Sequence, residues 1–315
     1  MQTHSPEAHA ARVDSGAEPR TQSPSVYVGI ATAGRREQLG RTLEQLARQS
    51  RLPDKTIVCP ASAEDFDGAR AASTNISLEV VRAPRGLCAQ RNAILDVSGD
   101  ADILVFFDDD YYPARDYIEN TLALFERYPD VTVATSWPKH DGATGPGIAH
   151  DEAIRVIETY PSIEGELPLR RAYGGYGCNM AIRLAPVREH RLRFDERLPL
   201  YGWLEDVDFT RRLAPFGRIV ACDALRGVHL GTKAGRGPGL RFGYSQIANP
   251  LYIFRKGSVS PRFVARQILR NVARNVTRSV RPEPWVDRRG RLLGNVLALK
   301  DLLRGTLAPE NILNL

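Results

Sequence analysis

The 315-residue chain has few cysteines and lacks a long apolar run. Its hydrophobic stretches are much shorter than the roughly 20 residues that a helix needs to span a bilayer, which excludes a transmembrane helix. Residues 1–24 are polar and have no apolar centre, so we expect a disordered leader and not a secretory signal. The four cysteines are scattered without metal-ligand spacing, and Cys59 and Cys222 lie within or at the end of apolar runs. These absences predict a cytoplasmic protein with buried thiols.

Acidic residues are missing from Ala224 to Pro282. This segment holds 12 of the 43 Lys and Arg residues, and the remainder, with 31 basic and 37 acidic residues, carries −6. The net charge of +6 therefore conceals an acidic body and a strongly basic extension. Such an extension predicts a phosphate-rich partner, which could be a membrane surface, a nucleic acid or an anionic polymer.

Arginines recur every fourth residue between Pro261 and Arg281, and apolar residues recur in step two positions later. The two sets are Arg262, Arg266, Arg270, Arg274 and Arg278, and Val264, Ile268, Val272, Val276 and Val280. At about 100° per residue, they lie on nearly opposite faces of a helix. The pattern predicts either a packed helix with a solvated arginine face or a peripheral helix on the inner face of the cell membrane, with its arginines toward anionic headgroups, and we favour the second. A second apolar stretch, Leu292 to Leu303, is expected to pack beside it.

Strands and helices are predicted to alternate through the first half of the chain. Apolar runs predict strands at 25–30, 55–59, 76–81, 102–107 and 131–136. Amphipathic patterns predict helices at 36–49, 87–97 and 115–128. A mobile loop at 139–147 is expected next, then strands at 178–182 and 218–222 on either side of a short helix at 205–213. The alternation is typical of βαβ units and a mostly parallel sheet flanked by helices.

Asp108, Asp109 and Asp110 follow directly on the predicted strand that ends at Phe107. Open α/β sheets bind their ligands at the carboxyl ends of strands. Adjacent anions repel one another, and a hard divalent cation that bridges to substrate phosphates would neutralise them. The sequence therefore predicts a metal site, with a solvated acidic turn before Tyr111 as the alternative.

Further motifs stand in a characteristic order around this triplet. Val28 to Arg35 and Arg85 to Ala93 precede it, whereas Gly177 to Met180, Trp203 to Asp208 and an isolated His229 follow it. In this combination and order, the chain resembles the family 2 glycosyltransferases of the GT-A fold.

The resemblance covers roughly Ser25 to Gly231 and implies an α/β fold with a mostly parallel nucleotide-sugar-binding sheet. It divides the chain into the leader at 1–24, a catalytic domain at 25–235 and a basic helical extension at 236–315. The implied activity is metal-dependent, inverting transfer of a sugar from a nucleotide-diphosphate sugar to a saccharide or lipid-linked acceptor. The extension is typical of bacterial members that build polysaccharides.

The resemblance also implies a role for each matching residue. The family's Asp-x-Asp motif falls on Asp108 and Asp110, of which Asp110 would bind Mn²⁺ or Mg²⁺, while Asp108 and Asp109 would face the ribose or metal-bound water. His229 is either a further metal ligand or a structural residue. Other donor contacts are expected from Ala31, Thr32, Arg35, Ser62, Arg85 and Arg91, since guanidinium groups suit phosphate oxygens.

One stretch departs from the family pattern. Many relatives carry an acidic residue just after the second strand that reads the nucleotide base. Here Ser62, Glu64 or Asp65 could take that place. The identity of the base therefore stays open.

An inverting transfer needs a base that deprotonates the acceptor hydroxyl. Glu205-Asp206 matches the motif that carries this base, and we assign the role to Asp206, with Glu205 as the second choice. The alternative is an ordinary helix N-terminus, where acids are favourable. Tyr201, Gly202 and Trp203 would offer an acceptor sugar an aromatic platform, with a buried Trp203 as the alternative.

Two other functions compete with this interpretation. A sugar nucleotidyltransferase shares the sheet and the metal carboxylates, but its first loop would be rich in glycine, and Ala31 to Arg36 holds one. A nucleic-acid-binding protein would use the basic extension, but the chain lacks the interleaved aromatic and basic residues of RNA-recognition motifs. We therefore expect no nucleic-acid partner.

Overall fold

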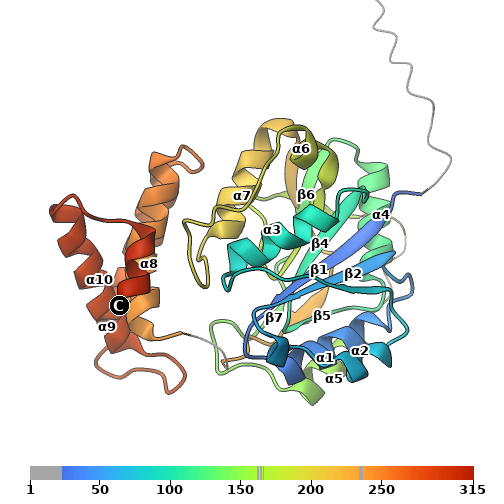
Figure 1. The fold of residues 1–315 in the computed structure, drawn as a ribbon, viewed down its shortest axis with the longest axis horizontal. Helices are drawn as coiled ribbons and strands as arrows, with labels where there is room; N and C mark the ends of the chain where they lie inside the picture. Colours follow the sequence, from blue (N-terminus) through green and yellow to red (C-terminus); the bar gives the residue numbers. More distant parts are fainter. Residues whose placement is uncertain (1–22, 162, 164, 166, 234–236) are drawn as a thin grey trace, which may run out of the picture.

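The computed structural model describes residues 23–161, 163, 165, 167–233 and 237–315, so the predicted leader lies almost wholly outside the described residues. A central eight-stranded sheet has the order β3-β2-β1-β4-β9-β6-β10-β8 (Figure 1). Its strands are β1 (Val26–Thr32), β2 (Lys55–Pro60), β3 (Leu78–Val80), β4 (Ile103–Asp108), β6 (Val131–Thr135), β8 (Leu169–Arg171), β9 (Asn179–Arg183) and β10 (Arg218–Cys222).

The sheet is mostly parallel, which confirms the predicted fold class. β1 pairs in parallel with β2 and β4, β2 with β3, and β6 with β10. β9 lies antiparallel between β4 and β6, and β8 is antiparallel to β10 at the edge. Val105 and Phe107 of β4 enter one core, whereas Leu104 and Phe106 enter the other. Burial on both faces explains why this strand reads as a continuous apolar run.

Helices cover both faces of the sheet. α1 (Arg36–Leu46) and α4 (Tyr117–Arg127) contribute to the core on one face. α3 (Leu87–Val97), α6 (Leu184–Glu189) and α7 (Glu205–Leu213) contribute to the core on the other. The shorter helical elements are η1 (Ala63–Asp65), α2 (Gly68–Ala72), α5 (His150–Glu158) and η2 (Ala214–Phe216).

A second, three-stranded sheet lies next to the carboxyl end of β4. It consists of β5 (Tyr111–Pro113), β11 (Gly227–His229) and β7 (His140–Asp141), with β11 in the centre. The segment that we predicted as a mobile loop thus contributes a strand, and the Gly142 N–H donates to the His229 carbonyl at 2.8 Å. This sheet carries residues from three distant parts of the sequence to one place.

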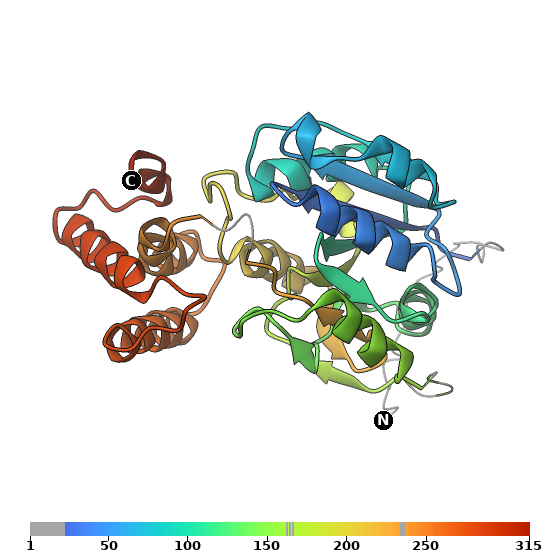
Figure 2. The ribbon, with the colours of Figure 1, turned by 90° about the horizontal axis from the view of Figure 1, so that it is seen from below.

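The C-terminal helices pack against one another beside the α/β layers (Figures 1 and 2). They are α8 (Gly239–Arg255), α9 (Pro261–Arg278) and α10 (Arg288–Leu303), followed by η3 (Pro309–Asn314). A Cβ on Gly243 would lie 2.0 Å from the Arg291 carbonyl oxygen, and one on Gly294 would lie 2.1 Å from that of Leu240. The two glycines therefore let the backbones of α8 and α10 touch. Among the described residues, every helix is too short or too polar to cross a bilayer.

Candidate active site

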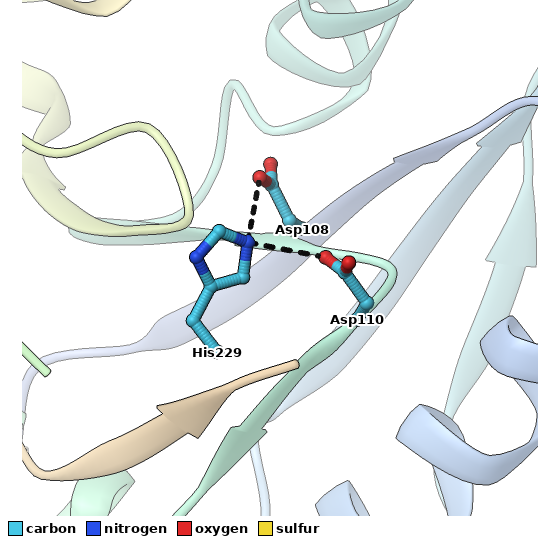
Figure 3. Close-up of side chains that lie close together, drawn as sticks. All are labelled: Asp108, Asp110 and His229. Atoms are coloured by element: carbon cyan, nitrogen blue, oxygen red, sulfur yellow. Dashed lines mark ion pairs between the residues drawn. The ribbon is translucent and has the colours of Figure 1, made fainter. Parts of the chain in front are cut away.

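Asp108, Asp110 and His229 meet at the carboxyl end of β4 (Figure 3). His229 Nε2 lies 3.4 Å from Asp110 Oδ1 and 3.9 Å from Asp108 Oδ2. Asp108 is the last residue of β4, Asp110 belongs to the turn into β5, and His229 ends β11. One ligand atom from each residue lies within 4.8 Å of the others, a spacing that suits a single cation.

His229 is oriented by a carboxylate on its other ring nitrogen. Nδ1 lies 2.9 Å from Asp141 Oδ1, which turns Nε2 toward Asp108 and Asp110. Burial alone would lower the pKa of His229, but Cys178 and the nearby carboxylates of Asp110 and Asp141 raise it well above its ordinary value. A carboxylate behind an imidazole is the usual support of a metal-binding histidine. The same Nε2 can accept a proton or a cation, so both predicted roles are chemically open.

The Asp110 carboxylate fits a cation on chemical grounds. Its Oδ2 accepts the Thr232 N–H at 2.7 Å, whereas its buried Oδ1 accepts no hydrogen bond from the described residues. Burial would raise the pKa of Asp110, but His229 and Arg35 hold it below the usual range. A buried, ionised oxygen beside a second carboxylate and an imidazole is a donor set that Mn²⁺ or Mg²⁺ accepts.

Asp109 is engaged on both carboxylate oxygens. Thr32 Oγ1 donates to Oδ2 at 2.7 Å, and Arg35 Nη1 donates to Oδ1 at 2.8 Å. Arg35 Nη1 also lies 3.5 Å from Asp110 Oδ2. Burial raises the pKa of Asp109 to about 7, against the opposing charge of Arg35. Asp109 thus ties the first loop to the acidic triplet, and Arg35 stands next to the cluster in which we expect the diphosphate.

Arg91 is fully buried and connects two motifs. Its Nη1 donates to Glu205 Oε1, and its Nη2 donates to the Gly177 carbonyl at 2.8 Å and lies 3.3 Å from Asp108 Oδ1. Its guanidinium stacks on the Phe106 ring, with the carbon 5.3 Å from the ring centroid. In the structure, the donors of Arg91, which we predicted as a diphosphate ligand, contact two carboxylates and a carbonyl.

Glu205 and Asp206 open α7 but occupy different surroundings. Glu205 is buried and its Oε2 has no hydrogen-bond partner among the described residues, and this burial raises its pKa well above the usual value. Asp206 is only partly buried and accepts N–H groups from Gly177 at 2.8 Å and Val207 at 2.7 Å. Burial also raises the pKa of Asp206 above 3.8, although Arg91 and these N–H groups oppose the shift.

The turn before α7 presents the aromatic residues. Leu200, Gly202 and Leu204 have φ values of 58°, 64° and 72°, of which only the glycine adopts such a value without strain. Trp203 is half-buried against Phe242, with ring centroids 5.8 Å apart. Tyr201, two positions earlier, is 63% exposed. Gly202 is buried and Trp203 is half-buried. Tyr201 is therefore the aromatic residue of this turn that is most open to a ligand.

A cavity of about 280 Å³ lies beside the carboxyl ends of β2 and β3. It is lined by Pro60, Ala61, Ser62, Ala63, Phe66, Val80, Arg82 and Ala83. The Asp65 carboxylate accepts the N–H groups of Gly34 at 2.6 Å and Ser62 at 3.0 Å, so it braces the two loops, whereas Ser62 and Glu64 are exposed. Arg85 is exposed on the next loop, and Ala31 is half-buried near the end of β1.

Sequence reasoning missed Asp141 and Arg82. Asp141 lies 88 residues before its partner His229 in a segment that reads as a loop, and no local pattern marks it. Arg82 follows the third strand closely and lines the cavity. A basic residue at the end of a strand was the available signal for Arg82.

These features together define a GT-A glycosyltransferase, and comparisons with known proteins agree. Residues 27–191 match the family described as Glycosyl transferase family 2, and the chain belongs to this family. This membership removes the sugar nucleotidyltransferase alternative. A comparison with curated protein sequences found no match.

Solved structures share the fold at low sequence identity. S. aureus TarS 1–349 is 16% identical with a TM-score of 0.57, and the match covers 91% of this chain and 82% of that chain. The mannosyltransferase PcManGT from Pyrobaculum calidifontis, solved with GDP-Man and Mn²⁺, is 17% identical with a TM-score of 0.54, over 93% of this chain and 86% of that one. Against a longer TarS chain, the match spans 35% of that chain.

Proposed function

We propose that the protein is an inverting glycosyltransferase that moves a sugar from a nucleoside diphosphate sugar to a saccharide or lipid-linked acceptor in bacterial polysaccharide synthesis. The observation that carries this proposal is the closeness of two centres: Asp108 of the carboxylate–histidine cluster and Glu205-Asp206 are joined through Arg91. One site could then bind the leaving diphosphate at the cluster and provide, from Glu205-Asp206, the carboxylate that accepts the proton of the acceptor hydroxyl. TarS 1–349 with UDP-GlcNAc and PcManGT with GDP-Man support the donor class.

Asp108, Asp110 and His229 would hold Mn²⁺ or Mg²⁺ in this proposal. Such a cation, when bound, stabilises the negative charge of the leaving diphosphate. The cavity beside β2 and β3 would take the nucleotide base, where Ser62 and Arg82 offer polar contacts. Arg85, exposed on the adjacent loop, would contact the diphosphate.

Asp206 would act as the base toward the acceptor hydroxyl. It is the more accessible carboxylate of its pair, and its raised pKa makes it a better proton acceptor near neutral pH than an ordinary aspartate. Glu205 would orient Arg91 and thereby the metal-facing Asp108. The exposed Tyr201 ring and the edge of Trp203 would support the acceptor sugar.

The chain divides, in this proposal, into a catalytic domain at 25–235 and a basic helical extension at 236–315 that associates with the inner face of the membrane. The contacts between them support a fixed arrangement. Asn249 of α8 donates to the Trp203 carbonyl at 2.8 Å, and Lys256 lies 2.8 Å from Asp208 of α7. The extension therefore contacts the elements that present the acceptor side of the site.

A panel of nucleotide sugars tests the function. Purified protein should release a nucleoside diphosphate from at least one donor in the presence of Mn²⁺ or Mg²⁺, faster when oligosaccharide or lipid-linked acceptors are added. Asp206→Asn serves as the control that keeps the donor site and lacks the base. If every donor fails to bind and to turn over with either metal, the proposal is wrong.

A further inference from the structure

The solvent-facing side of α9 and α10 exposes a set of large apolar side chains, which we call the apolar seam. Its members are Leu269 and Val276 of α9, Val280 just after α9, and Leu293, Val296, Leu299 and Leu303 of α10. Val280 is 77% exposed and Leu303 is 89% exposed. Residues this apolar and this open are unusual as a group, and they indicate a surface that contacts something apolar.

The helix contacts show that the seam lies on one side of the helix pair. Asn275 of α9 and Asn295 of α10 are buried and hydrogen-bonded to each other at 2.8 Å, and Asn295 also donates to the Gly243 carbonyl of α8. At about 100° per residue, Val276 and Val296 are each turned by one step from these asparagines. Because α9 and α10 run antiparallel, the two steps lead to the same side, away from α8.

Cations that far outnumber the acids lie beside the seam. The exposed arginines of the α9 stripe lie on one flank, and Arg289 and Lys300 of α10 and Arg304 just after it are also exposed. Residues 237–315 contain 14 Lys and Arg residues but only four acids, of which Glu283 pairs with Arg288 and Glu310 with Arg197. The surface therefore presents uncompensated positive charge around an apolar centre.

We propose that this surface binds an anionic lipid bilayer, with the apolar seam at the level of the acyl-chain boundary and the cations among the headgroups. An apolar face bordered by Lys and Arg is the pattern of helices that lie in the membrane interface. A second copy of the chain is the rival occupant, but it would bring the same uncompensated positive charge to the contact, whereas an anionic bilayer complements it. This inference specifies the membrane association proposed above and does not depend on the transfer reaction.

The position of the C-terminal helices beside the turn before α7 bears on how an acceptor reaches the site. Phe242 of α8 packs against both Tyr201 and Trp203, with ring centroids 5.8 Å apart in each pair. The membrane-bound helices would therefore stand directly behind the turn that supports the acceptor. An acceptor carried on a lipid would reach the site from the surface to which these helices bind.

Vesicle flotation with the full chain tests the electrostatic half of the proposal. The protein should float with vesicles that contain phosphatidylglycerol, much less with pure phosphatidylcholine, and less as salt rises. Arg266→Gln, Arg270→Gln and Arg274→Gln combined should weaken binding by roughly 100-fold, since each cation at an anionic surface contributes about fivefold. The matched control replaces three exposed arginines of the catalytic domain by Gln, namely Arg48, Arg115 and Arg155. This control variant should bind the vesicles like the wild type.

A second variant tests the apolar half. Val296→Ser, Leu299→Ser and Leu303→Ser change exposed side chains, so the fold and the thermal transition should survive while binding to anionic vesicles falls at least about tenfold. Sedimentation of the wild type without lipid should show a monomer. Equal binding to both lipids, no binding to either, or a dimer that the serine variant dissociates would each overturn the proposal, and the last would assign the seam to a second copy.

Discussion

Arg91 is a fully buried cation that contacts carboxylates from two motifs more than 90 residues apart in the chain. At this scale, the site consists of charges that hold one another in place: Arg35 faces Asp109 and Asp110, and Arg91 faces Asp108 and Glu205. Such pairs lower the cost of gathering several carboxylates at one strand end, because each cation offsets part of the repulsion. Because these charges are largely buried, the stability of the protein is sensitive to the loss of either partner of a pair.

Replacing Arg91 by Met should destabilise the protein strongly. The change leaves Glu205 buried beside other carboxylates without its ion-pair partner, which typically costs about 3–5 kcal/mol. Adding Glu205→Gln to Arg91→Met should recover part of the loss, because the uncompensated charge is then gone. Urea unfolding of the single and double variants measures both effects, and a single variant within about 1 kcal/mol of the wild type would contradict this account of Arg91.

Asp206→Asn should lower the transfer rate by roughly 10²–10⁴ while leaving donor affinity almost unchanged, because the base is lost and the metal and diphosphate contacts remain. The wild-type rate should fall with decreasing pH as Asp206 takes up a proton, with a midpoint above its ordinary value of 3.8. The variant should lack this acidic limb. Steady-state rates across pH provide the measurement, and an inactive Glu205→Gln beside an active Asp206→Asn would transfer the role to Glu205.

At the scale of elements, close backbone contacts and strained turns position the site. Leu200 and Leu204 hold left-handed conformations directly before α7, at a cost of about 1–3 kcal/mol each. α8 supports this turn through Asn249, and α8 itself lies backbone to backbone against α10 at Gly243 and Gly294. The C-terminal helices thus buttress the turn that presents Glu205-Asp206.

Gly294→Ala should weaken this support. The added Cβ would lie 2.1 Å from the Leu240 carbonyl oxygen and 2.6 Å from the Tyr244 nitrogen, and backbone atoms cannot rotate away. We expect a net loss of at least about 2 kcal/mol, because the clash outweighs the better helix propensity of alanine. Gly99→Ala is the control, since its Cβ would meet nothing within 4 Å. Equal thermal stability of the two variants would show that α8 and α10 can separate freely.

At the scale of the whole molecule, three parts meet beside the candidate site: the mostly parallel sheet, the small three-stranded sheet and the C-terminal helices. The periodicity of apolar residues predicted the strands and helices of the first part, because each element is buried in the way that its pattern indicates. The antiparallel insertion of β9 and the small sheet could not be predicted in this way. Their strands are short, and their pairing is set by contacts between distant segments.

The same limit applies to the candidate site. The triplet Asp108 to Asp110 was visible because its residues are consecutive at a strand end, and family resemblance supplied His229 and Asp206. The partner of His229 on its second nitrogen, Asp141, depends on β7 lying beside β11, which no local pattern reveals. The buried position of Arg91 was likewise hidden, since an arginine in a helix usually reads as a surface charge.

The central claim is that the cluster at the end of β4 holds a divalent cation on which the donor diphosphate depends. Calorimetric titration with UDP and GDP, in excess Mn²⁺ or in excess chelator, tests it most directly, with wild type and the near-isosteric Asp110→Asn compared. Wild type is expected to bind at least one of the two nucleotides with Mn²⁺ and to lose this binding with chelator. Asp110→Asn is expected to bind neither nucleotide in either condition and to keep its thermal transition. Equal nucleotide binding and full transfer activity of the wild type in chelator would contradict the claim.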